Sequence, residues 1–179
     1  MRNAVILHGT SDSPDSYWIP WLKAELQKKG YKVWAPQLPD ANRPNLGTQL
    51  PFVLEGGHFG EETVLVGHSA GCPLILSVLE KLDVKVKEAV LVAGYSAPLP
   101  HGASILQPSY DWEGIKSRCG DFVFINSDDD PWGCDDKQGR IMFDHLGGTQ
   151  VILHGEGHMG SSRFNQPYKE FPLLLKLID

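Results

Sequence analysis

The sequence lacks any apolar run close to the ~20 residues that a membrane-spanning helix requires, so we expect no membrane partner. Its first apolar run, residues 4–7, is too short for the core of a signal peptide and has no cleavage site behind it. An excess of positive charge is also missing, because 16 Lys and Arg residues stand against 22 Asp and Glu residues and give a formal net charge of −6. A nucleic-acid partner requires a basic surface, so this balance argues against one.

Cysteine is scarce as well. The three cysteines, Cys72, Cys119 and Cys134, are odd in number and widely spaced, which is typical of free thiols and not of a disulfide framework. Free thiols suit a reducing compartment, so the sequence predicts a cytoplasmic protein. Linkers, repeats and low-complexity segments are missing too, and we therefore expect a single domain over residues 1–179, with 41% hydrophobic residues to fill its core.

Six short apolar runs alternate with segments of helical periodicity. Continuous apolar runs of this kind suit strands that are buried on both faces of a parallel sheet. The pattern predicts an α/β fold, a three-layer α/β/α sandwich with about six parallel strands. The expected strands are residues 4–7, 31–35, 63–66, 89–93, 121–125 and 149–153. The expected helices are residues 17–29 with Ser16 as N-cap, a segment within 47–54, the segment after residue 69, 111–117, 137–146 and 168–178.

The third apolar run leads into Gly67-His68-Ser69-Ala70-Gly71, which has the G-x-S-x-G spacing of a nucleophile elbow. We expect a tight turn from strand to helix in which a Cβ at Gly67 or Gly71 would collide with its neighbours. Ser69 would stand at the helix N-terminus, where the Ala70 N–H and the helix dipole face a developing negative charge. A G-x-S-x-G match of five residues also occurs by chance, so its context in the neighbouring sequence must show whether it marks a nucleophile.

That context comes from the ends of the predicted strands. Ligands of open parallel sheets bind outside the carboxyl ends of the strands. Polar residues directly follow four of the apolar runs: residues 8–10, Ser69, residues 128–130 and His158. Serine, acid and histidine occur in the chain order that α/β-hydrolases use.

Each of these residue types has a role in acyl transfer. A histidine takes the proton of a serine hydroxyl and later gives it to the leaving group, and a carboxylate orients the histidine. The residues alone leave Asp128, Asp129 and Asp130 open as the acid. The Ala70 N–H is one expected oxyanion donor, and we choose the Thr10 N–H as the second because Gly9 allows a tight turn there.

Two further histidines adjoin these residues. The residue before the nucleophile normally faces away from it, so we interpret His68 as structural. His8 is expected to order the loop that carries Thr10.

The quoted residues together resemble a known family. Residues 5–9, 67–71, 129–131 and 157–158 resemble the α/β-hydrolase fold and, more closely, the small cap-less serine hydrolases related to retinoblastoma-binding protein 9 and its bacterial relatives. The resemblance covers nearly the whole chain and implies a minimal sheet without the first two strands of larger members. It implies a triad of Ser69, Asp130 and His158, with the acid directly before a proline. The chain departs from the family pattern at Trp132-Gly133-Cys134, so Asp129 stays open as the acid.

The leading hypothesis is a serine hydrolase that cleaves a small ester, thioester or amide through an acyl-enzyme, with a small-molecule acyl substrate, no cofactor and no metal. Residues 128–130 could also bind Mg²⁺ or Ca²⁺, although nothing else in the sequence completes such a site. The departure after Asp130 motivates an alternative, a hydrolase-fold binding or scaffold protein with little or no activity. A flavodoxin-like nucleotide binder is a third reading, but no phosphate-cradling glycine loop follows the first strand. The sequence does not identify a protein partner.

Overall fold

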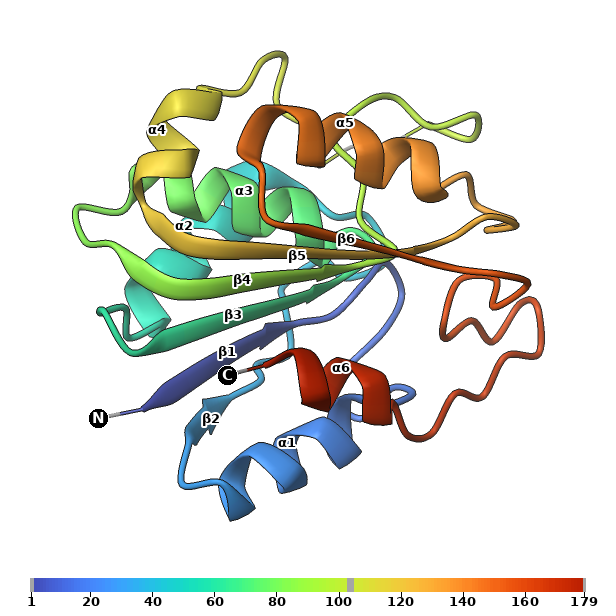
Figure 1. The fold of residues 1–179 in the computed structure, drawn as a ribbon, viewed down its shortest axis with the longest axis horizontal. Helices are drawn as coiled ribbons and strands as arrows, with labels where there is room; N and C mark the ends of the chain where they lie inside the picture. Colours follow the sequence, from blue (N-terminus) through green and yellow to red (C-terminus); the bar gives the residue numbers. More distant parts are fainter. Residues whose placement is uncertain (1, 103–104, 179) are drawn as a thin grey trace.

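The computed structural model describes residues 2–102 and 105–178. Its centre is a six-stranded sheet in which every neighbouring pair is parallel, with the strand order β2-β1-β3-β4-β5-β6 (Figure 1). The strands are β1 (Asn3–Leu7), β2 (Lys32–Trp34), β3 (Thr63–His68), β4 (Val86–Val92), β5 (Cys119–Ser127) and β6 (Thr149–Leu153). The helices are α1 (Ile19–Lys28), α2 (Leu46–Gly56), α3 (Gly71–Lys81), α4 (Trp112–Ser117), α5 (Asp136–Leu146) and α6 (Pro172–Leu177).

Helices cover both faces of the sheet. Helices α1 and α6 pack together on one face, and α2, α3, α4 and α5 form the layer on the other (Figure 1). This is the α/β/α arrangement that the alternation of apolar runs predicts, because each strand buried on both faces must be covered by a helix on each side. Among the described residues, no helix has the length and apolar character needed to cross a membrane.

The central elements β3 and α3 are more completely buried than the periodicity of their apolar residues predicts. All six residues of β3 are buried, and α3 is buried on every side from Gly71 to Leu79 because it lies between the sheet and the neighbouring helices α2 and α4. The sequence predicts only an apolar stripe for this helix. The enclosed position of α3 therefore comes from its tertiary neighbours.

Several predicted boundaries are wrong, among them the start of β4, which begins at Val86 and not at residue 89. Helix α1 begins at Ile19 with Trp18 as N-cap, because the Ser16 hydroxyl instead accepts a hydrogen bond from the Ser13 N–H in the preceding loop (3.0 Å). The last helix begins only at Pro172, which has no N–H to donate and suits a first helical position. Strand β5 continues to Ser127, since residues 126 and 127 still pair with β6.

The strand order places the expected site. Chain neighbours β1 and β2 pair on one side of β1, and β3 pairs on its other side, so the order reverses between β1 and β3. The carboxyl ends of parallel strands meet at one edge, and a crevice forms where the order reverses. The loops after β1, β3, β5 and β6 therefore meet there, although Leu7 and His158 are 151 positions apart in the chain.

Candidate active site

Ser69 lies in the tight turn between β3 and α3. Its φ of 53° is in the left-handed region, and its N–H donates to the Val92 carbonyl at the end of β4 (2.9 Å). A Cβ on Gly71 would collide with the Leu7 carbonyl oxygen of β1, and a Cβ on Gly67 would lie 2.9 Å from Ile75 Cδ1 of α3. The predicted need for glycine at both positions is confirmed, and the crowding keeps the turn in one conformation.

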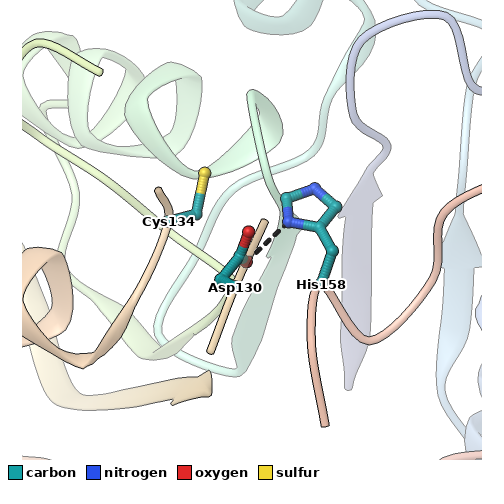
Figure 2. Close-up of side chains that lie close together, drawn as sticks. All are labelled: Asp130, Cys134 and His158. Atoms are coloured by element: carbon teal, nitrogen blue, oxygen red, sulfur yellow. Dashed lines mark hydrogen bonds and ion pairs between the residues drawn. The ribbon is translucent and has the colours of Figure 1, made fainter. Parts of the chain in front are cut away.

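Asp130 and His158 form a buried pair. Asp130 Oδ2 and His158 Nδ1 lie 2.7 Å apart, with exposed fractions of 8% and 5% (Figure 2). The other carboxylate oxygen of Asp130 accepts the backbone N–H of Trp132 (2.8 Å). Because the carboxylate only accepts, Nδ1 carries the hydrogen and Nε2 is left to act as a base. Asp130 is therefore the aspartate that contacts His158.

The two preceding aspartates hold the loop that carries His158. Asp129 accepts hydrogen bonds from the Ser127 hydroxyl (2.6 Å) and the Gly157 N–H (2.8 Å), and these bonds hold the pKa of Asp129 below its usual value. Asp128 pairs with His154 (2.6 Å), which likewise lowers the pKa of Asp128. Asp129 thus fixes the residue directly before His158 without touching the imidazole.

The backbone around His158 is held by three more side chains. Its N–H donates to Gln166 Oε1 (2.9 Å), and its carbonyl accepts from His68 Nε2 (3.0 Å). The next carbonyl, that of Met159, accepts from the Trp18 indole N–H (3.0 Å). Burial lowers the pKa of His68 to about 3, so this ring is neutral and Nε2 holds its single hydrogen. His68 is structural, as its place before Ser69 predicts.

Two backbone N–H groups close to Ser69 in the fold are free within the described part of the chain: one in the loop after β1 and one in the elbow. Among the described residues, the Thr10 and Ala70 N–H groups have no hydrogen-bond acceptor. His8 orders this loop, since its Nδ1 donates to the Gly9 carbonyl (2.9 Å) and its Nε2 accepts the Leu38 N–H (3.0 Å). Burial lowers the pKa of His8, so the ring is neutral in this role.

The Ser69 hydroxyl has a neighbour that sequence reasoning missed. This neighbour is the Cys134 thiol, which is only 1% exposed; burial raises the pKa of this thiol, and the nearby Ser69 hydroxyl acts in the opposite direction. Within the described residues, Ser69 makes no hydrogen bond with His158. Cys134 is the last residue of the segment that departs from the family pattern, and this departure was the available signal.

The position of Cys134 is fixed by a buried amide. Asn126 is fully buried at the end of β5, and its Nδ2 donates to the carbonyls of Cys134 (2.9 Å) and Gly94 (3.1 Å). These bonds tie the loop between β5 and α5 to the end of β4. The backbone of Cys134 is therefore fixed by a buried side chain of β5.

A cavity of about 750 Å³ opens over these groups, a size typical of small-molecule sites. Ser69, His158 and Thr10 line it, whereas Asp130 is not among its lining residues. Its other walls combine aromatic and aliphatic side chains with charged and polar ones, among them Asp12, Tyr17, Arg43, Tyr95, Leu99, Ile105, Trp132, Cys134, Ser162 and Arg163.

Asp12 is a second residue that the sequence did not single out. Its Oδ2 lies 3.8 Å from His68 Nδ1, and the Tyr17 hydroxyl lies beside its carboxyl. Burial raises the pKa of Asp12 to about 6, although the Tyr17 hydroxyl and the nearby His158 ring act in the opposite direction. Its position in the β1 loop was visible in the sequence, but its burial was not.

Comparison with known proteins agrees with the fold and the motifs. A family model described as serine hydrolase matches residues 4–178. YdeN of Bacillus subtilis (strain 168), a hydrolase by its name, is 32% identical over 135 residues, which are 72% of this chain and 71% of YdeN. The serine hydrolase RBBP9 of Rattus norvegicus is 25% identical over 167 residues, or 89% of this chain and 87% of RBBP9. The crystal structure of the B. subtilis ydeN gene product has a TM-score of 0.89 at 24% identity, with 99% of this chain and 96% of that chain covered. The chain has the α/β-hydrolase fold and belongs to the serine hydrolase family.

Proposed function

We propose that this protein hydrolyses small esters, thioesters or amides through an acyl-enzyme, with Ser69 as nucleophile, His158 as general base and Asp130 as the orienting acid. The observation that carries the proposal is the buried 2.7 Å contact between Asp130 and His158 over a cavity that Ser69 also lines. The departure of the sequence after Asp130, which motivated a non-catalytic alternative, does not remove this contact.

In the proposed mechanism, His158 Nε2 takes the proton of Ser69 Oγ as the oxygen attacks the acyl carbon. The Thr10 and Ala70 N–H groups, which have no acceptor among the described residues, stabilise the oxyanion, and losing one such donor costs ~3 kcal/mol. His158 then protonates the leaving group, and a water molecule repeats the sequence to release the acid.

The cavity supports a small acyl group. Its described walls include Tyr17, Tyr95, Leu99, Ile105 and Trp132, which offer apolar and aromatic surface close to Ser69. Short or aromatic acyl chains fit a cavity of about 750 Å³ better than long alkyl chains do. We keep the cytoplasm as the proposed location because its reducing conditions suit three cysteines that are unpaired in the structure.

A fluorophosphonate probe and a panel of p-nitrophenyl esters test the proposal. The wild type should be labelled and should hydrolyse acetyl and butyryl esters, and Ser69→Ala should abolish labelling and lower kcat by roughly 10⁴ to 10⁶. Ser162→Ala is the matched control, because Ser162 is an exposed serine at the same cavity. Labelling that survives Ser69→Ala would remove Ser69 as the nucleophile.

Asp130→Asn and Asp129→Asn then test the assignment of the acid. We expect Asp130→Asn to lower kcat by about 10⁴, since the imidazole loses its tautomer and its countercharge. Asp129→Asn should have a much smaller effect. A larger loss at Asp129 would transfer the role of the acid to that residue.

A further inference from the structure

We propose that Asp130, Cys134 and His158 form a binding site for a thiophilic divalent cation, Zn²⁺ above all, which inhibits the enzyme reversibly. One ligand atom from each side chain lies within 4.8 Å of the other two, and all three residues are buried (Figure 2). Asp130 and Cys134 come from the loop between β5 and α5, and His158 comes from the loop after β6.

The three ligand types match zinc. A thiolate sulfur, an imidazole nitrogen and a carboxylate oxygen are the groups that Zn²⁺ binds, and three protein ligands leave a fourth position for water or substrate. With bonds of about 2.0 to 2.3 Å, the ligand atoms of a tetrahedral site lie about 3.3 to 3.6 Å apart. The 2.7 Å contact of Asp130 with His158 must widen slightly, and Cys134 must approach, which small side-chain rotations supply. Mg²⁺ and Ca²⁺ prefer six or more oxygen ligands, which this group does not provide.

A cation can reach the site from solvent. Cys134 and His158 both line the cavity of about 750 Å³, which the exposed residue Thr10 also borders. The Asp12 carboxyl on the same cavity adds negative charge, whereas Arg43 and Arg163 at its walls oppose a cation. The cavity therefore connects the three ligands to solvent. The thiol makes the site selective for a soft metal.

Binding displaces the proton of the Cys134 thiol to the solvent, and the hydrogen of His158 moves from Nδ1 to Nε2, so that the sulfur, Nδ1 and a carboxylate oxygen of Asp130 bond to the metal. The metal then occupies Asp130 and His158, so His158 no longer accepts the proton of Ser69. This inhibition rests on the proposed function, but the binding itself rests only on the geometry of the three ligands.

Calorimetry with Zn²⁺ tests the binding directly. The full chain, treated with EDTA and desalted, should bind one Zn²⁺, and Cys134→Ser should weaken the affinity at least ~10-fold. Cys119→Ser, another buried cysteine, and His154→Gln, which removes the exposed pair with Asp128, should keep the wild-type affinity. Absence of binding by the wild type, equal affinity in Cys134→Ser, or loss of binding in His154→Gln would each overturn the proposal.

Two readouts need neither activity nor a stable Cys134 variant. Co²⁺ in place of Zn²⁺ should give a thiolate-to-cobalt charge-transfer band in the wild type. Zn²⁺ should also slow alkylation of Cys134 by iodoacetamide, measured on the peptide by mass spectrometry, and EDTA should restore the rate. Lack of both effects contradicts a thiolate ligand. A chain that shows both effects but hydrolyses no ester would overturn the proposed function and leave the metal site intact.

Discussion

Replacing Asp12 with asparagine should change how the stability of this protein depends on pH. The carboxyl of Asp12 is partly buried, with 13% of its side chain exposed, and it faces the Tyr17 hydroxyl, the neutral His68 ring at 3.8 Å and the His158 ring. Burial raises its pKa from 3.8 to about 6. The folded protein therefore keeps this proton over a pH range in which the unfolded chain has lost it.

The sign and size of the effect follow from linkage between protonation and folding. Between pH 3.8 and about 6 the folded state binds more protons than the unfolded state, so the contribution of Asp12 to stability falls as pH rises. A shift of about 2 pKa units corresponds to about 3 kcal/mol at pH 7 and above. Asparagine has nearly the same shape, can still contact Tyr17 and does not ionise, so it removes this dependence.

Urea unfolding of wild type and Asp12→Asn at several pH values between 4 and 8 measures the effect. The variant should become the more stable protein as pH rises, with the difference in unfolding free energy growing by about 3 kcal/mol and levelling off above pH 7. Asp15→Asn, at an exposed position in the same loop, controls for the loss of one negative charge. Parallel curves for wild type and Asp12→Asn would refute the reasoning.

Three further predictions concern the residues that support the site. Gly71→Ala should prevent folding or lower the melting temperature strongly in circular dichroism, because its Cβ meets the Leu7 carbonyl; a normal melting curve would contradict the crowded turn. Asp129→Ala should lower kcat of ester hydrolysis about ten-fold, because it removes the bond to the Gly157 N–H and loosens the loop before His158. Asp128→Asn, whose partner is the exposed His154, should leave kcat unchanged. Equal losses in the two variants would contradict the different roles given to these aspartates. In the wild type, His68 lowers the stability as pH falls from 6.5 toward about 3, because the unfolded chain binds a proton at this histidine before the folded protein does. His68→Gln should lack this part of the acid destabilisation in urea unfolding at several pH values. Unchanged acid unfolding would argue against the burial of His68 as a neutral ring.

Local sequence determined the elbow and the sheet. The apolar runs of β1, β3 and β6 and the two glycines around Ser69 act over a few residues, so their pattern is readable without the fold. The loops at the strand ends are also readable, because parallel strands in an α/β sheet present their carboxyl ends at one edge. The candidates Ser69, His158 and the group of three aspartates follow from these local rules.

Tertiary structure decided which aspartate faces the histidine. Asp129 and Asp130 are adjacent in the chain and chemically identical, yet one bonds the Gly157 N–H and the other bonds the imidazole. That difference arises from how the loop after β5 meets the loop after β6. The burial of Asp12 and the approach of Cys134 to Ser69 likewise depend on chain segments brought together from a distance, so residue type and spacing alone do not predict them.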